Sequence, residues 1–419
     1  MKIINVRGLF VIALFAASLL TAGCGGGGGT PAGVVVGAGG GGGGTAANVQ
    51  SISVNGGPLV SQGSIYPNGA FTSVTICVPG TASCQVIDDV LVDTGSYGLR
   101  LLASQVTLSL PTLSSSAGAE MNCVSFVDLS YLWGPVAVAD IKLGTKEVAA
   151  STPLQLISAD TNVPTSCSSG NTTGDEDTQA TLGSNGILGV GPEPNDCGPA
   201  CDPADTNTPP TGDPYYTCTS STCTAALVAQ ADQVTNPVVL FTDNNGVVVE
   251  LPATSGEAEA TLSGSLIFGI NTQSNNQLTA TNVFSLDQFD NFTVIFPTNG
   301  PALTSSFIDS GSNGYFFPDS TIPNCTSPEQ AFFCPTSLTA LSATNEDPNT
   351  LFTNTVSFSV DNADTLFSTN SGADAVFSTL GGTNTASSFD WGLPFFYGRN
   401  VFTGIDQLAI GGPGPFWGY

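Results

Sequence analysis

Two short segments of this chain each place one aspartate at the end of an apolar run. The first reads Val-Leu-Val-Asp-Thr-Gly-Ser at 90–96, and the second reads Phe-Ile-Asp-Ser-Gly-Ser at 307–312. Self-similarity usually marks one structural unit used more than once. The apolar run predicts a buried strand, and the glycine after Asp-Thr or Asp-Ser permits a sharp turn. Each copy therefore delivers one carboxylate, Asp93 or Asp309, to the end of a buried strand.

If a pseudo-twofold axis relates the two copies, the two carboxylates meet across it. Like charges a few ångströms apart cannot both ionise, so one pKa rises, the other falls, and the pair shares one proton. Such a pair can act as general base on a water and as general acid on a leaving amine. The chain has no histidine, which excludes Ser-His-Asp and Cys-His nucleophile systems and histidine-based metal sites. We predict neither a metal nor a cofactor.

The duplicated motif resembles the two active-site loops of the pepsin-like aspartic proteases. One copy alone would be weak, because Asp-Thr-Gly and Asp-Ser-Gly are ordinary turn sequences. The resemblance implies an all-β fold of two pseudo-twofold-related lobes with an interlobe cleft, and catalytic roles for Asp93 and Asp309. It also implies that the hydroxyl residue after each aspartate bonds across the lobes and that the following serine orients the outer carboxylate oxygen. The loop-supporting residues are then Thr94, Gly95, Ser96, Ser310, Gly311 and Ser312.

Segment 126–144 resembles the flap hairpin of the same family, which covers the substrate. The flap and substrate-binding candidates are Phe126, Asp128, Ser130 and Tyr131. The family's flap tyrosine falls on Phe126, which can cover a bound chain but has no hydroxyl to donate. Tyr131 is the alternative source of that hydroxyl, and a purely structural hairpin is the other interpretation.

Further resemblances follow in the family's order and extend over most of 49–406. Gly-Ile-Leu-Gly-Val-Gly at 186–191 resembles the strand beside the first active-site loop, and 391–406 resembles the closing segment. Two departures are Leu393, where the family usually has Asp, and Arg100, where it typically has Trp. The chain also looks like an uncharacterised group of bacterial lipoproteins that carry these two loops.

The N-terminus reads as an export signal followed by a tether. Residues 1–23 have a basic start and a short apolar run, and Leu-Thr-Ala-Gly-Cys at 20–24 resembles a lipobox with Thr21 in place of Leu. Cys24 is the expected lipidation site, and a plain secretory signal is the alternative. The glycine-rich stretch 24–48 predicts a flexible tether that holds the folded part off a membrane.

The cysteines indicate an oxidising compartment. Eleven cysteines less Cys24 leave ten, and an even number in an exported chain implies disulfides. Sequence neighbours suggest Cys77 with Cys84, Cys197 with Cys201, Cys218 with Cys223 and Cys325 with Cys334, which leaves Cys123 for Cys167. Sequence alone does not prove this connectivity. Zinc bound by the four cysteines of 197–223 is the alternative, although their spacing does not match paired Cys-x-x-Cys.

Length and charge complete the expectations. The 419 residues suffice for two cores, which we place at 49–260 and 261–419. Short strands are expected throughout, with one helix at 225–234 and a hairpin of 238–241 with 247–251. The formal net charge of -27, with six basic residues, disfavours nucleic acid and anionic membrane surfaces as partners.

These observations lead to a functional hypothesis with one competitor. The leading hypothesis is a lipid-anchored, monomeric aspartic endopeptidase of the bacterial cell envelope. Its substrate would be an extended peptide or protein segment in the interlobe cleft. The competing hypothesis is a binding or structural envelope protein that keeps the two loops without hydrolysis, since fold does not fix function.

Overall fold

The protein is all-β, as the sequence predicts. The structure, a computed structural model, describes residues 46–419 apart from 160–161, 205–213, 221, 298, 385–386 and 407–413. The α-helices in this part of the chain have only four to six residues: α1 (Thr165–Ser168), α2 (Gln179–Leu182) and α3 (Ala363–Ser368). The expected signal peptide, the lipidation site Cys24 and the tether up to residue 45 lie outside the described residues.

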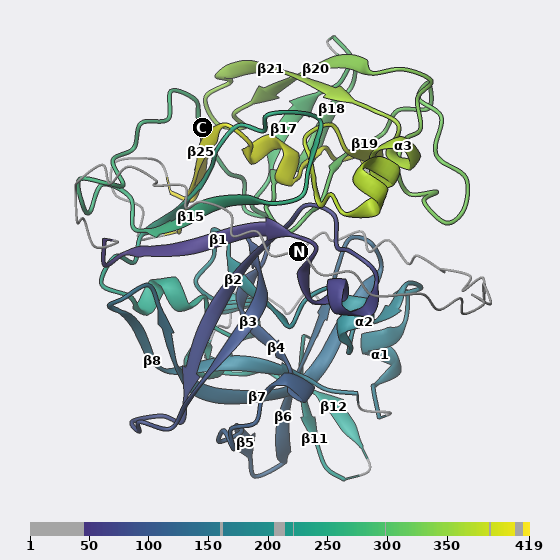
Figure 1. Ribbon diagram of the computed structural model, residues 1–419. Helices are drawn as coiled ribbons and strands as arrows, with labels where there is room; N and C mark the ends of the chain where they lie inside the picture. The colour runs from purple at the N-terminus through teal and green to yellow at the C-terminus, as the bar shows by residue number, and fades with distance from the viewer. Residues whose placement is uncertain are drawn as a thin grey trace, which may run out of the picture.

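A large network of hydrogen-bonded strands joins both ends of the chain, and short Gly-, Pro- and Asn-containing turns separate its strands. In Figure 1, β2 to β8 occupy one end of the molecule, and β1 and β15 cross its middle. The seventeen strands are β1 (Val49–Asn55), β2 (Gly69–Cys77), β3 (Cys84–Asp93), β4 (Tyr97–Leu102), β5 (Ser114–Ser115), β6 (Gly118–Ser125), β7 (Ser130–Leu143), β8 (Glu147–Ile157), β9 (Gly174–Asp175), β10 (Gly186–Val190), β11 (Tyr215–Cys218), β12 (Cys223–Ala225), β13 (Gly246–Leu251), β15 (Leu262–Phe268), β16 (Val283–Ser285), β25 (Arg399–Gly404) and β26 (Phe416–Gly418).

A second sheet lies at the opposite end of the molecule (Figure 1). Its strands are β17 (Phe292–Ile295), β18 (Ala302–Ile308), β19 (Tyr315–Phe317), β20 (Thr339–Glu346), β21 (Thr353–Val360), β23 (Gly381–Thr383) and β24 (Asp390–Trp391). A small pair, β14 (Ala258–Glu259) with β22 (Val376–Phe377), stands apart. The strands expected at 52–54, 71–78, 86–92, 266–269, 292–296 and 356–360 are thus present, within one to four residues at their ends.

The two halves of the chain repeat one local arrangement of strands. In the first, β10 runs parallel to β3 and antiparallel to β4, the strand that follows β3. In the second, β24 runs parallel to β18 and antiparallel to β19, the strand that follows β18. In both cases a strand from later in the sequence pairs with the two strands that an Asp loop connects. The internal repeat seen in the sequence is therefore also a repeat of topology.

The boundary expected at residue 260 falls within a continuous strand network. β1 pairs with β2 on one side and with β15 on the other, while β13 pairs with both β15 and β25. Ile52 and Val54 alternate with more exposed serines along β1, and both are buried in the largest apolar cluster. This cluster also contains residues of the second sheet, so its apolar packing continues across the expected boundary.

Aromatic rings fill the core around the second sheet. Phe317 and Phe389 stack with ring centroids 5.0 Å apart, and Phe389 lies 4.2 Å from Trp391. Phe296 and Phe358 contact the same group edge-on or tilted. Each such side chain buries a large apolar area, which stabilises this end of the molecule and fixes β24 beside β18.

Two local expectations are wrong. Residues 225–234 form no helix: after β12 the chain is extended apart from one 3-10 turn at Gln230–Asp232. Val228 and Val234 are both buried in a cluster with Val136 and Tyr215, and an extended chain brings both valines to it. Residues 237–240 are also a 3-10 turn, so no hairpin forms with β13, which instead pairs with β15 and β25. In both segments tertiary packing overrides the local pattern.

Five disulfides confirm the pairing that sequence neighbours suggest. The bonded pairs are Cys77–Cys84, Cys123–Cys167, Cys197–Cys201, Cys218–Cys223 and Cys325–Cys334. A sulfur in a disulfide is no thiolate ligand, so the zinc alternative for the cysteines of 197–223 is wrong. Cys123–Cys167 joins β6 to α1 and closes the longest loop of the five.

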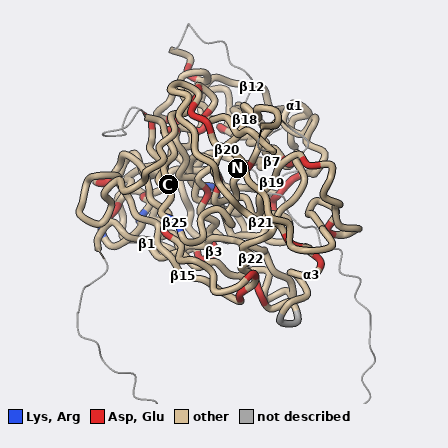
Figure 2. Tube along the Cα trace, turned by 90° about the horizontal axis from the view of Figure 1, so that it is seen from above, with Lys and Arg blue, Asp and Glu red and all other residues tan. Residues whose placement is uncertain are grey.

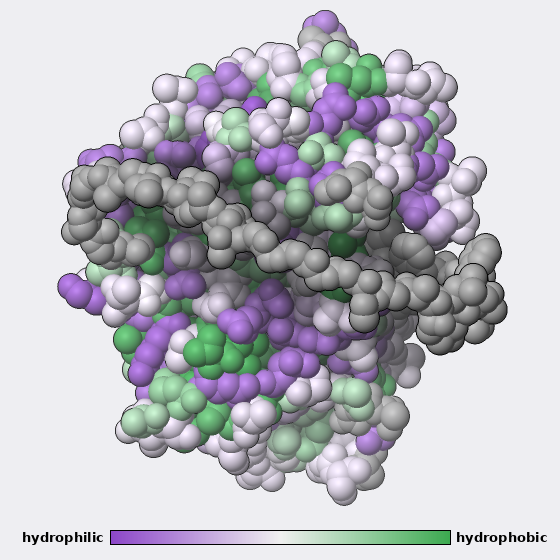
Figure 3. All heavy atoms as spheres, viewed as in Figure 1, coloured by the Kyte–Doolittle hydropathy of each residue, from purple (hydrophilic) through white to green (hydrophobic). Residues whose placement is uncertain are grey.

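Acidic residues are scattered along the chain and basic residues are few, as the coloured Cα trace in Figure 2 shows. On the visible face in Figure 3, hydrophobic side chains occur in small groups among hydrophilic ones. No helix in the described ranges has the length and apolar character needed to cross a bilayer.

Candidate active site

The two Asp motifs sit at equivalent ends of buried strands. β3 ends at Asp93, and β18 ends one residue before Asp309. Gly189 of β10 lies opposite Asp93, as the resemblance implies for the glycine-rich strand. In the second copy, the Asp309 amide donates to Trp391 O at 3.0 Å. Main-chain pairing on both sides holds each loop, so the carboxylates have little freedom to move.

Reciprocal hydrogen bonds join the two loops. The Thr94 amide donates to Ser310 Oγ at 3.1 Å, and the Ser310 amide donates to Thr94 Oγ1 at 3.0 Å. Each hydroxyl also donates to the opposite strand, Thr94 Oγ1 to Ile308 O at 3.3 Å and Ser310 Oγ to Val92 O at 2.8 Å. All four bonds are buried and link residues more than 200 positions apart, so they fix one loop relative to the other.

The two carboxyl groups face each other across these loops. Each accepts the amide of its own loop glycine, Gly95 to Asp93 Oδ1 at 2.8 Å and Gly311 to Asp309 Oδ1 at 2.7 Å. A Cβ added to Gly311 would lie 2.7 Å from Asp93 Oδ1 and 3.1 Å from Asp309 Oδ1, so both oxygens are close to the same point. A Cβ added to Gly95 would likewise lie 2.6 Å from Asp309 Cγ. Only glycine leaves room for this approach.

The pair binds a proton at a pH where an isolated aspartate would not. Burial raises the pKa of Asp93 to about 7, with further contributions from the charge of Asp309 and from the hydrogen bond between the two side chains. Both aspartates are fully buried. Asp93 therefore keeps its proton at mildly acidic pH, where an ordinary aspartate has lost it.

The serine of each loop orients the outer oxygen of its aspartate, but the two sides differ. Ser96 Oγ donates to Asp93 Oδ2 at 2.6 Å. Ser312 Oγ lies 3.0 Å from Asp309 Oδ2 and 2.7 Å from Asp390 Oδ2. A hydroxyl has one proton, so both contacts are hydrogen bonds only if one of the two carboxyls is protonated. Asp390 is therefore a third buried carboxyl, which is linked through Ser312 to Asp309.

Sequence reasoning missed Asp390. It precedes the closing segment that was compared with the resembled family, where Leu393 stands in place of an acid. The residue belongs to β24, whose pairing with β18 brings it to Ser312. An acidic residue inside an apolar stretch between Phe389 and Trp391 was the available signal, because a buried carboxyl needs a partner.

The negative charge of Asp390 is expected to help raise the pKa of Asp93. In Asp390→Asn the amide donates to Ser312 Oγ, whose proton then goes to Asp309, and the negative charge of Asp390 is lost. Because a nearby negative charge raises the pKa of a carboxyl group, its loss is expected to lower the raised pKa of Asp93, by on the order of one unit. Among the strands paired with β24, only β19 carries another titratable side chain, Tyr315. NMR titration of the carboxyl ¹³C shift of Asp93 measures this change, and a pKa equal to the wild-type value in Asp390→Asn would contradict the assignment.

The family comparison adds a classification without a function. A family described as a protein of unknown function, DUF3443, matches residues 44–419. The chain belongs to this DUF3443 family. No curated protein sequence matches the chain. The match covers both Asp loops, Asp390 and all five disulfides of this DUF3443 member.

The predicted hairpin of this DUF3443 member is present, but its aromatic side chains diverge. β6 and β7 pair around a turn in which Asp128 accepts from the Ser130 amide at 3.0 Å and from its hydroxyl at 2.7 Å. Phe126 is buried in one apolar cluster with Phe71. Tyr131 belongs to a different cluster with residues of β6 and β11. The alternative that Tyr131 supplies the flap hydroxyl is therefore not supported by its packing.

Arg100 has a structural explanation in the DUF3443 chain. It is buried in β4, where it forms an ion pair with Asp196 at 2.9 Å. Its other terminal nitrogen donates to Asn122 Oδ1 at 2.7 Å and to Gln155 Oε1 at 2.6 Å. These bonds tie β4, the strand that leaves the first Asp loop, to β6 and β8. A charge at this depth is stable only with such partners.

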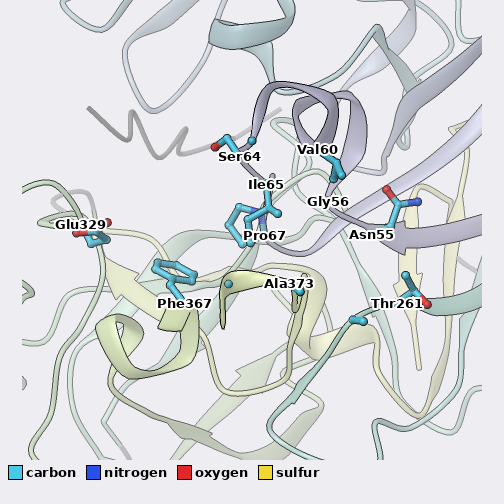
Figure 4. A pocket seen from close by; sticks show the side chains of 13 residues that line it. Asn55, Gly56, Val60, Ser64, Ile65, Pro67, Thr261, Glu329, Phe367 and Ala373 are labelled. Carbon is cyan, nitrogen blue, oxygen red and sulfur yellow. The ribbon is translucent and has the colours of Figure 1, made fainter. Parts of the chain in front are cut away.

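A groove of about 580 Å³ in this DUF3443 member is lined by residues of 55–67 and 367–373 and does not include the carboxyl pair. Figure 4 shows Ile65 and Pro67 on one side of it and Phe367 of α3 on the other. Neither Asp93 nor Asp309 is among its lining residues, so its size says nothing about the pair. Tyr66, between the two lining residues, is buried in the cluster that contains Phe126.

Proposed function

We propose that this DUF3443 member is an aspartic endopeptidase with a pepsin-like arrangement of two lobes. The observation that carries the proposal is the pair of buried carboxyls, Asp93 and Asp309, which approach the same point and are held by reciprocal bonds between Thr94 and Ser310. The repeated strand arrangement around both loops supports it, because it supplies the pseudo-twofold relation that the mechanism needs.

The chemistry uses one water and one shared proton. The ionised carboxyl takes a proton from a water between the two aspartates, and the water oxygen adds to the carbonyl carbon of the peptide. The protonated carboxyl stabilises the developing oxyanion, and a proton then passes to the leaving amine as the C–N bond breaks. The pair regains its starting protonation after products leave. The raised pKa of Asp93, about 7, leaves the pair singly protonated at mildly acidic pH.

The substrate in this proposal is an extended peptide that lies over the pair and under the hairpin of β6 and β7. We also propose that the protein is located in the cell envelope. Five disulfides favour an oxidising compartment outside the cytoplasm, and lipidation of Cys24 would anchor the protein to a membrane.

A statine-type peptide tests the proposal, because its hydroxyl mimics the tetrahedral intermediate. We expect it to bind the purified protein at acidic pH and to lose affinity as pH rises through about 7, where the pair loses its proton. Calorimetric titration across this range gives the dissociation constant at each pH. If no binding occurs at any pH and no peptide of a library is cleaved, the competing hypothesis of a binding or structural envelope protein is favoured.

A further inference from the structure

Tyr66 is buried in an apolar cluster that reaches the first Asp loop, because the same cluster contains Leu91, two residues before Asp93. The side chain is 3% exposed and contacts Phe71 edge-on, with ring centroids 6.0 Å apart. A Cβ added to Gly183 would lie 2.2 Å from Tyr66 Cδ2, and one added to Gly69 would lie 2.9 Å from Cδ1. Two glycines thus leave a slot for this ring, and the ring has little freedom to turn.

The backbone near Tyr66 is anchored to the second Asp loop. Asn68, two residues later, donates to Asn313 O at 2.8 Å and to Phe377 O at 2.9 Å. Its side-chain oxygen accepts from the Phe377 amide at 2.6 Å and from the Tyr397 hydroxyl at 2.7 Å. Asn68 is buried and has φ of 52°, a conformation that asparagine tolerates better than most residues. These hydrogen bonds hold segment 66–68 against the loop that carries Asp309.

The hydroxyl of Tyr66 is a buried donor without an acceptor. Among the residues that the structure describes, it has no hydrogen-bond partner. Burial raises the pKa of Tyr66 well above its usual value, and the charges of Glu176, Asp309, Asp93 and Asp128 raise it further. The phenol therefore stays protonated at acidic and neutral pH and can only donate to a ligand acceptor. Buried donors are rarely left unpaired, so an acceptor is expected in the functional state.

The hairpin provides no aromatic hydroxyl in the cluster that contains Phe126. Phe126, at the position that resembles the flap tyrosine, cannot donate, and Tyr131 packs in another cluster. Tyr66 shares the cluster of Phe126 but comes from the segment before β2. The ring of Tyr66, in the same cluster as Phe126, therefore carries the hydroxyl donor that Phe126 lacks.

We propose that Tyr66 is a substrate-binding residue whose hydroxyl donates a hydrogen bond to the main chain of a peptide held over Asp93 and Asp309. The inference rests on the proposed peptidase function and adds a residue to its site. A main-chain carbonyl is the acceptor that every peptide substrate offers, so the bond positions the scissile segment without selecting side chains. No proton transfer is assigned to Tyr66.

Two tyrosine variants separate a binding role from a structural one. Tyr66→Phe removes a hydroxyl that has no partner in the free protein, whereas Tyr216→Phe removes one that bonds Ser166 Oγ at 2.8 Å in a different cluster. We expect Tyr66→Phe to keep or raise the Tm, and to weaken binding of the statine-type peptide by roughly tenfold. We expect Tyr216→Phe to lower the Tm and to leave the dissociation constant unchanged.

The outcomes are distinct. Wild-type affinity in Tyr66→Phe overturns the inference while leaving the peptidase proposal intact. A lower Tm in Tyr66→Phe also overturns it, because the hydroxyl then has a partner in the free protein. If the wild-type protein neither binds the statine-type peptide nor cleaves a peptide library, the peptidase function fails, and the role of Tyr66 falls with it.

Discussion

Replacing either Asp93 or Asp309 by asparagine is expected to reduce peptide cleavage by roughly 10³-fold or more. The amide of asparagine cannot take a proton from water and cannot share one with the remaining carboxyl. The two single variants should lose similar activity, because the pair acts as one unit with one proton. Cleavage of a peptide library, followed by mass spectrometry, measures the loss for each variant.

A matched control separates this loss from a general effect of charge removal. Asp319→Asn changes a carboxylate that bonds Thr321 in an exposed turn away from the pair. We expect this variant to cleave at the wild-type rate. The catalytic assignment is wrong if Asp93→Asn or Asp309→Asn, folded and with an unchanged Tm, also cleaves at that rate.

Gly311→Ala should destabilise the protein and abolish cleavage. The added Cβ would lie 2.6 Å from Asp93 Cγ, so the carboxyl pair or the loop must shift. Overpacking of this kind typically costs about 1–3 kcal/mol of unfolding free energy. The two carboxyls move apart, so the shared proton is lost together with activity. Chemical denaturation measures the change in stability, and the cleavage assay measures the change in rate.

Gly256→Ala is the control for this substitution. A Cβ at Gly256 would meet only Ala258 O, at 3.9 Å, so no clash is expected. Stability should stay within about 0.5 kcal/mol of the wild type. If Gly311→Ala were as stable and as active as Gly256→Ala, the close approach of the two loops would be refuted.

The duplicated motif was the most informative feature of the sequence. Asp93 and Asp309 were predicted to meet because each ends a buried apolar strand before a glycine-containing turn and a pseudo-twofold axis would relate the two copies; the structure brings both side chains together. The cross-loop bonds of Thr94 and Ser310 came from the family resemblance, and the structure contains them. The disulfides were predictable because four of the five join near neighbours in the sequence.

The residues that sequence reasoning missed depend on long-range contacts. Asp390 reaches Ser312 only because β24 inserts beside β18, and the segment that carries Tyr66 is tied to the second Asp loop only by the bond from Asn68 to Asn313 and its neighbours. No local pattern encodes either pairing. The helix expected at 225–234 is wrong for the same reason, since packing of Val228 and Val234 in one cluster with Val136 and Tyr215 decides the local conformation.

The titration of Asp93 tests the central claim most directly. Carboxyl ¹³C chemical shifts, followed by NMR against pH, give its pKa in the wild type and in Asp309→Asn. We predict a pKa of about 7 in the wild type. In the variant it should fall, because the charge and the hydrogen bond of Asp309 both raise it, although burial still holds it above the usual value. A wild-type pKa near the ordinary value of about 3.9, or one that Asp309→Asn leaves unchanged, would contradict a shared proton.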